Sequence, residues 1–235
     1  MAKPYDTWTV LPHRPLEKLE PNLWRIEGDL PGSSSGTRVM TVVKLDSGGL
    51  LIHNAIALED DLMKEIEGFG RPEILIVPNG FHRLDARVFK QRYSSVRVLC
   101  PASERKKVAK VVAVDGTFDD GPKDSSVKLY HLDGAKQHEG VVEVKSSSGT
   151  TLVFNDAINN LPKLGGVMGF MLSPTGRPAV PRIFRWFFVA DRAAFTSGVE
   201  KLAAMPDLKR VIVSHGAMMS DKPADALRTA LTAMN

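Results

Sequence analysis

Polar side chains that can bind a metal ion or move a proton follow several apolar, strand-like runs of this sequence. The run 74–77 turns through Asn79-Gly80 to His82, the run 151–154 leads to Asp156, and the run 211–213 leads to His215. Side chains just past the ends of strands gather at the sheet edge where mixed α/β folds build their sites. Imidazole and carboxylate groups there bind cations or act as acids and bases. The pattern predicts that His82, Asp156 and His215 form a site.

Four other polar residues in similar places are candidates with a structural alternative. His53 ends the run 50–53, and it is equally consistent with a buried histidine that bonds to backbone. His138, a candidate fourth metal ligand, stands in the short pattern His138-Glu139-Gly140. Asn79 and Asp85 either contact a ligand or order the turn and the start of the next helix. Asp156 has the same alternative, because it is also placed to cap a following helix.

Cationic residues near these positions suggest a second kind of chemistry. Arg83 follows His82 directly, and Arg177, Arg182 and Arg185 lie beside a run of aromatic residues, 184–188. These guanidinium groups either line a pocket for an anionic ligand or belong to an amphipathic helix with a packed aromatic face.

The elements that position these residues follow from periodicity. Alternating runs and turns predict an antiparallel meander over 23–55, with turns at 31–36 and 46–49. Helical spacing predicts an amphipathic helix over 58–67. Strands and helices then alternate, which is typical of crossover units; the predicted ranges are strands 74–77 and 96–99, helices 86–93 and 102–111, strands 127–132, 141–144 and 151–154, helix 191–204, strand 210–213 and helix 223–234. We expect two facing sheets with helices outside, in one domain over 1–235.

Composition excludes some classes of protein. The 31 basic residues exceed the 27 acidic ones by four without forming a block, which suits anionic ligands weakly and does not indicate nucleic acid. A single cysteine, Cys100, excludes an internal disulfide framework and fits a reducing compartment. The sequence shows neither the apolar core of a signal peptide nor a run of ~20 apolar residues. We therefore expect a cytoplasmic protein without a membrane partner, and a homo-oligomer stays open.

The order of elements and the strand-end residues resemble the metallo-β-lactamase fold, from about Leu23 to about Met219. The sequence is most similar to the DUF4336-like branch of that superfamily. The Pro-Asn-x-x-His stretch of this branch is matched by Pro78-Asn79-Gly80-Phe81-His82, and its Thr-Leu-x-x-x-Asp by 151–156. Its histidine after an early strand resembles His53. The resemblance implies an α/β fold, a four-layer αββα sandwich, and a hydrolase-like protein.

The sequence departs from active members of the superfamily at one motif. They carry His-x-His-x-Asp-His, whereas residues 79–84 read Asn-Gly-Phe-His-Arg-Leu. The resemblance therefore implies that the two-metal site is lost, with the charge of Arg83 where a cation would sit. One hypothesis is a mononuclear zinc, iron or manganese site of His82, Asp156 and His215, with or without His138, that hydrolyses a small ester, thioester, lactam or phosphoester. The other is a metal-free binding module whose Arg83 and Arg182 hold an anionic small molecule.

Overall fold

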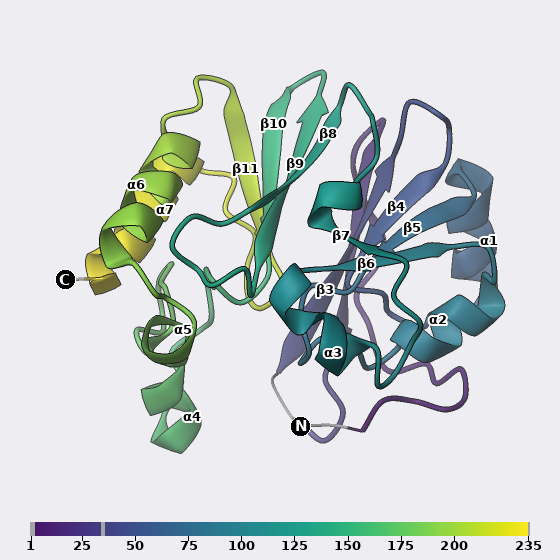
Figure 1. Cartoon of the computed structure of the whole chain (residues 1–235), viewed down its shortest axis with the longest axis horizontal. Coiled ribbons are helices and arrows are strands. Elements are labelled where there is room, and N and C mark those ends of the chain that lie inside the picture. The colour runs from purple at the N-terminus through teal and green to yellow at the C-terminus, as the bar shows by residue number, and fades with distance from the viewer. Residues whose placement is uncertain (1–2, 34–35, 235) are drawn as a thin grey trace. The chain divides into compact units, whose positions relative to one another are not determined.

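The computed structural model describes residues 3–33 and 36–234. The chain divides into two compact units, residues 1–128 and 129–235. Residues 34 and 35 of the predicted turn 31–36 lie outside the described residues, as do residues 1, 2 and 235 of the predicted domain. Each unit has one sheet and its own helices (Figure 1).

The first unit contains a seven-stranded sheet in which the strands lie side by side in chain order. Neighbours up to β4 are antiparallel, which confirms the predicted meander, and β4 to β7 are parallel. The parallel half results from the predicted crossover helices between strands. The strands are β1 (Glu17–Glu20), β2 (Leu23–Asp29), β3 (Thr37–Lys44), β4 (Leu50–His53), β5 (Pro72–Ile76), β6 (Arg97–Cys100) and β7 (Gly116–Thr117).

Helices α1 (Asp60–Phe69), α2 (Ala86–Arg92) and α3 (Arg105–Val108) pack on this sheet (Figure 1). Apolar side chains of each helix are buried with strand residues in one core cluster, which includes Met63 of α1 and Phe89 of α2. The predicted helix 102–111 is shorter in the structure, where a 3₁₀ turn at Ala102–Glu104 precedes α3. After α3 the chain continues as a turn, in which the Val111 and Val112 N–H groups donate to the Val108 carbonyl at 2.9 and 3.2 Å.

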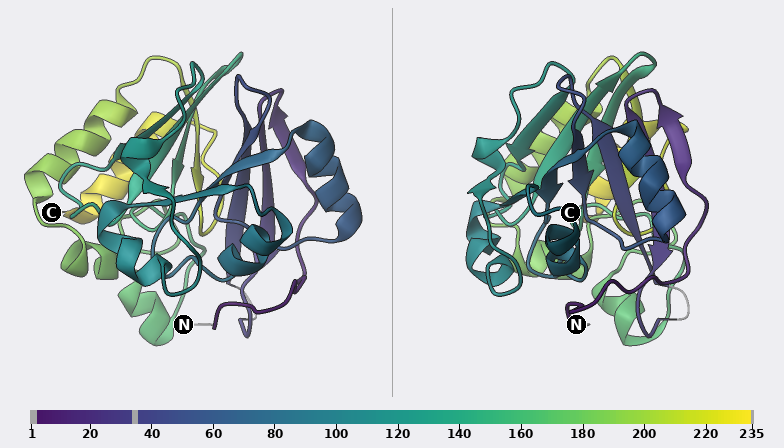
Figure 2. Two further views of the ribbon diagram at one scale, coloured as in Figure 1. Left: turned by 45° about the vertical axis from the view of Figure 1, so that its right-hand side comes forward. Right: turned by 90° about the vertical axis from the view of Figure 1, so that its right-hand side faces the viewer.

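The second unit contains a four-stranded sheet in the order β11-β10-β9-β8. Strands β9 and β10 form an antiparallel hairpin, while β10 and β11 are parallel. Helices α6 and α7 cover this sheet, and their Phe195 and Leu227 are buried with Phe154 and Val211 (Figure 2). The elements are β8 (Val127–His131), β9 (Gly140–Ser146), β10 (Gly149–Phe154), α4 (Gly166–Met171), α5 (Arg182–Phe187), α6 (Arg192–Ala203), β11 (Leu208–Val213) and α7 (Pro223–Leu231).

Parallel register brings strand ends together within each unit. In the first unit His53 of β4 pairs with Ile76 of β5, and in the second Phe154 of β10 pairs with Val213 of β11. The loops after these strands carry the predicted site residues. Among the helices in the described ranges, none is long and apolar enough to cross a membrane.

Candidate metal-binding residues

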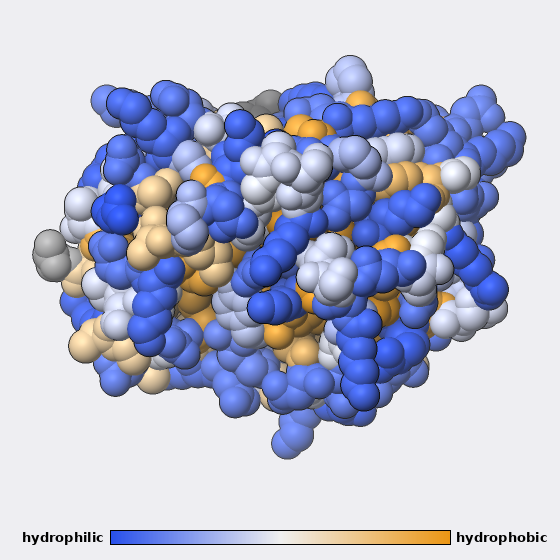
Figure 3. All heavy atoms as spheres, turned by 90° about the horizontal axis from the view of Figure 1, so that it is seen from above, coloured by the Kyte–Doolittle hydropathy of each residue, from blue (hydrophilic) through white to orange (hydrophobic). Residues whose placement is uncertain are grey.

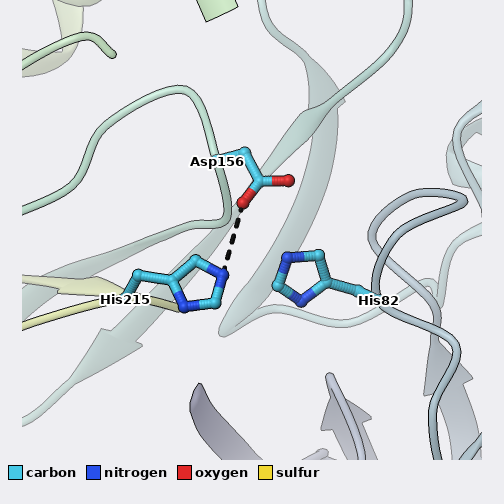
Figure 4. A group of neighbouring side chains, drawn as sticks. All are labelled: His82, Asp156 and His215. Atoms are coloured by element: carbon cyan, nitrogen blue, oxygen red, sulfur yellow. Dashed lines mark ion pairs between the residues drawn. The ribbon is translucent and has the colours of Figure 1, made fainter. Parts of the chain in front are cut away.

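Asp156 and His215 lie together in the second unit. They follow the adjacent parallel strands β10 and β11, and Asp156 Oδ1 is 3.5 Å from His215 Nε2 (Figure 4). About a quarter of each side chain is exposed, 26% for Asp156 and 23% for His215. The predicted convergence of strand-end residues is confirmed for this pair. A solvent-accessible carboxylate beside an imidazole can bind a cation or share a proton.

A buried carboxylate, Glu139, holds the turn that carries Asp156. Its oxygens accept hydrogen bonds from the backbone N–H groups of Asn155 at 2.8 Å, Asp156 at 2.7 Å and Ala157 at 2.9 Å. Burial, and then the charge of Asp156, raise the pKa of Glu139 to about 8, although the three N–H donors favour the charged form. The pattern His138-Glu139-Gly140 drew the sequence prediction to the histidine, and Glu139 was missed.

We expect the Glu139→Gln variant to change how stability depends on pH. The pKa of Glu139 is raised in the folded state, so the folded protein binds more protons than the unfolded chain between about pH 4.5 and about pH 8. The wild-type free energy of unfolding should therefore fall as pH rises through this window, and the slope should flatten in the variant. Urea unfolding of metal-free protein across the window measures both slopes. Glu200→Gln, at an exposed helix position, is the control; equal slopes in wild type and Glu139→Gln would contradict this role.

The loop that carries His215 is held by the segment around Asn160. The Asn160 N–H donates to the His215 carbonyl at 3.3 Å, and the Ala217 N–H donates to the Asn160 carbonyl at 3.1 Å. Between them Gly216 adopts φ +96°, where residues with a Cβ are strained. Gly216 therefore allows the backbone to turn directly after His215.

In the first unit, Asn54 orients the ring of His82. Asn54 Nδ2 donates to the Val39 carbonyl at 2.9 Å, so the amide oxygen Oδ1 faces His82 Nδ1 at 3.2 Å. An oxygen acceptor requires a proton on Nδ1, which places the lone pair of the neutral ring on Nε2. Metal-binding histidines are commonly oriented in this way by a second residue. In this tautomer Nε2 is the nitrogen of His82 that can bind a metal ion.

Asn54 was missed because the sequence shows only an asparagine after a strand. In the structure it has φ +59°, a left-handed conformation in which asparagine is enriched. The Asn54 N–H donates to the Ile76 carbonyl at 3.0 Å. The end of β5 thus fixes the residue that orients His82, and an asparagine directly after a strand-end histidine is the signal that could have indicated it.

We expect Asn54→Ala to weaken metal binding at His82 without removing a ligand. Loss of the Oδ1 acceptor frees the ring to rotate and to change tautomer, and loss of such an orienting residue typically costs about 10- to 100-fold in metal affinity. Competition with a chromophoric zinc chelator measures the dissociation constant. Asn22→Ala, in the turn between β1 and β2, is the control. An unchanged affinity in Asn54→Ala would show that this contact does not orient the ligand.

Two residues near His82 that we predicted to contact a ligand, Asn79 and Arg83, form hydrogen bonds within the first unit. The side chain of Asn79 is buried, and its Oδ1 accepts the Phe81 N–H at 2.8 Å, which is the turn-ordering alternative. Arg83 donates to the Lys107 carbonyl at 2.6 Å, at the end of α3. This hydrogen bond holds the guanidinium of Arg83 at the end of α3. The sequence comparison implied that this charge takes the place of a metal ion, and that implication stays a prediction.

Asp85 belongs to the core of the first unit. It pairs with Arg38, accepts the Ala57 N–H at 3.3 Å and makes no side-chain cap bond to α2. Burial raises the pKa of Asp85, although the charge of Arg38 opposes this shift. In the structure the Asp85 carboxyl has internal partners, Arg38 and the Ala57 N–H, and its contact with a ligand stays a prediction.

Three further candidates lie in buried or aromatic surroundings. His53 is the buried last residue of β4. His138 is buried too, and its ring stacks on Phe188 with centroids 3.6 Å apart. Arg182, on α5, stacks over the ring of Phe170 at 4.0 Å. The predicted aromatic helix is present, and its arginine stands against aromatic rings of its own unit.

Comparisons with known proteins identify the fold. No protein-family model matches the sequence, and a search of curated proteins found no relative. Among solved structures, a metallo-beta-lactamase from Pontibacter korlensis is similar with a TM-score of 0.64 and 14% identity, over 94% of this chain and 98% of that one. Two structures of DIM-1 metallo-beta-lactamase, one exposed to ceftazidime, have TM-scores of 0.66 and 0.65 at 15% identity, over 97% of this chain and 100% of theirs.

The chain has the metallo-β-lactamase fold. The predicted α/β class is confirmed by its two sheets and by this likeness. At 14–15% identity the likeness shows the fold alone, and a fold hosts many functions. Function must therefore be argued from the side chains.

Proposed function

We propose that this metallo-β-lactamase-fold protein is a hydrolase that holds one metal ion with His82, Asp156 and His215. The contact between Asp156 and His215 at adjacent strand ends carries this proposal. We propose His82 as the third metal ligand, because its contact with Asn54 puts the proton on Nδ1 and leaves Nε2 as the nitrogen that can bind the ion. Each of the three side chains offers one ligand atom (Figure 4). The proposal includes that both units act as one domain over 1–235, as the sequence predicts.

The donor set fits a catalytic rather than a purely structural ion. Two imidazole nitrogens and one carboxylate oxygen suit zinc, with iron or manganese as alternatives, and three protein ligands leave a position open. When bound, such an ion acts as a Lewis acid and lowers the pKa of a water to about 7. Asp156 and His215 would hold the ion or orient the water, and His82 would act as a ligand or as the general base. Glu139 keeps the Asp156 turn in place. The substrate class is a small ester, thioester, lactam or phosphoester.

The proposal also includes descent from a two-metal site. Residues 79–84, Asn-Gly-Phe-His-Arg-Leu, have none of the four ligands of the His-x-His-x-Asp-His pattern in place, and His82 stands at one of its variable positions. Phe81 and Leu84 have no ligand atoms, so a second ion would lack donors from this stretch. This supports a mononuclear site of the DUF4336-like kind.

Metal analysis tests the proposal. We expect purified protein to contain zinc, iron or manganese in stoichiometric amount by inductively coupled plasma mass spectrometry, and the His82→Ala/His215→Ala variant to lose it. His13→Ala, which removes a histidine paired with Glu59, is the control and should retain the metal. Circular dichroism verifies that each variant is folded. If the folded wild type binds none of these metals, the hydrolase proposal fails, and binding of anionic metabolites becomes the function to test by thermal shift.

A further inference from the structure

The second unit exposes a group of large apolar side chains on α4 and α5. Among the described residues, seven large apolar side chains stand exposed, and five of them lie between 167 and 187. Isolated exposed apolar residues are ordinary, but such a concentration marks an interaction surface. We call these five residues the α4–α5 patch: Val167, Met168, Phe170, Trp186 and Phe187, with exposed fractions of 79%, 62%, 55%, 53% and 57%.

The patch lies on a projecting part of the second unit and differs from the face drawn in Figure 3. Helix α4 projects away from the sheet of the second unit (Figures 1 and 2). On the face drawn in Figure 3, by contrast, hydrophobic residues occur in small groups interrupted by hydrophilic ones. Because α4 projects, its exposed apolar side chains could insert into the boundary between lipid headgroups and acyl chains without disturbing the packing of the second unit.

The charge of the chain is concentrated around this patch. Residues 157–190 contain four basic residues, Lys163, Arg177, Arg182 and Arg185, and no aspartate or glutamate. The whole chain has 31 basic and 27 acidic residues, so the remaining residues carry 27 of each sign. The entire formal excess of four positive charges therefore lies in the segment that contains the apolar patch. An anionic partner is complementary to it.

One of these cations, Arg182, lies among the apolar side chains of the patch. The guanidinium of Arg182 lies 4.0 Å from the ring centroid of Phe170 and 5.7 Å from that of Trp186. The rings of Phe170 and Trp186 meet edge to face, with centroids 6.2 Å apart. Tryptophan beside arginine on an exposed apolar helix is typical of a segment that lies at a membrane interface, with its rings at the headgroup level.

We propose that the α4–α5 patch binds the surface of a membrane that contains anionic lipids. The apolar tips enter the boundary between headgroups and acyl chains, and the basic residues contact the anionic headgroups. A second copy of the chain is a poorer occupant, because a symmetric contact would set one acid-free cationic segment against another. A soluble anion would satisfy the arginines and leave the apolar tips in water. This inference is independent of the metal site. It departs from the expectation of a protein without a membrane partner, which rested on the lack of a spanning segment and not on the exposed surface.

Vesicle sedimentation and fluorescence test the inference on the whole 235-residue chain. We expect binding to phosphatidylcholine vesicles that contain phosphatidylserine and at least tenfold weaker partitioning onto pure phosphatidylcholine. Lipids with brominated acyl chains should quench the fluorescence of Trp186, and this quenching should disappear in Trp186→Phe. The other two tryptophans, Trp8 and Trp24, are half-buried in the first unit and remain as an internal reference.

Matched apolar variants separate insertion from a general attraction of a basic protein. Met168→Ser/Phe187→Ser removes two tips of the patch and should weaken binding at least tenfold. Val10→Ser/Phe81→Ser removes the other two exposed large apolar side chains of the described residues and should bind like wild type. The proposal is overturned if both double variants bind alike or if quenching persists in Trp186→Phe. It is also overturned if light scattering shows a wild-type dimer that does not bind vesicles and that Met168→Ser/Phe187→Ser converts to a monomer.

Discussion

The Arg38→Leu variant is expected to lose about 3–5 kcal/mol of unfolding free energy at neutral pH. Arg38 and Asp85 form a buried ion pair in the first unit, with side-chain exposures of 3% and 0%. Removal of the cation leaves the carboxyl of Asp85 buried without its partner, and an uncompensated buried charge is costly. Arg38 lies on β3 and Asp85 precedes α2, so the pair also joins the sheet to the loop after His82. Urea denaturation followed by circular dichroism measures the loss.

Two further variants show whether burial is the cause. Arg87→Leu removes a partner from the exposed pair with Asp6, whose side chains are 34% and 57% exposed, and should cost no more than about 1 kcal/mol. Arg38→Leu/Asp85→Leu removes both charges and should recover part of the loss, because apolar residues often replace a buried pair without a large cost. The interpretation fails if Arg38→Leu is no more destabilising than Arg87→Leu.

The Gly216→Ala variant is expected to destabilise the second unit by about 2–4 kcal/mol and to displace His215. Two effects add at this position. Gly216 has φ +96°, which strains a residue with a Cβ. A Cβ there would also overlap the carbonyl oxygen of Asn160, and because this neighbour is backbone it cannot move aside by changing rotamer. Denaturant unfolding gives the stability, and metal affinity reports the displacement of His215.

Gly48→Ala is the control that separates the two effects. Gly48 has φ +83°, close to that of Gly216, but an added Cβ would meet no atom within 4 Å. It should therefore show the conformational cost alone, about 1 kcal/mol. If Gly216→Ala and Gly48→Ala lose the same stability, contact with Asn160 does not matter. Retained metal affinity in Gly216→Ala would show that the tight turn does not hold His215.

Local pattern was sufficient to predict the main elements and one part of the candidate site. Alternating and helical periodicities located the strands and most helices, since these periods depend on which side of a short segment is buried. Asp156 and His215 could be predicted as site residues because both follow apolar runs that read as strands. The structure shows that β10 and β11 are neighbours, which brings the two side chains together. The concentration of positive charge in 157–190 is also readable from the sequence.

The contacts that hold the site residues were decided by tertiary structure alone. Glu139 reaches the turn at 155–157, Asn54 reaches His82, and Arg38 pairs with Asp85, across separations of 16 to 47 residues. No local period encodes such a pair, because its formation depends on which strands become neighbours and in which register. Likewise, the sequence leaves Arg182 equally suited to an anion pocket or an aromatic helix, and only packing shows it stacked on Phe170. Side-chain type along the chain determined what chemistry is available, and burial and register decided which side chains meet to perform it.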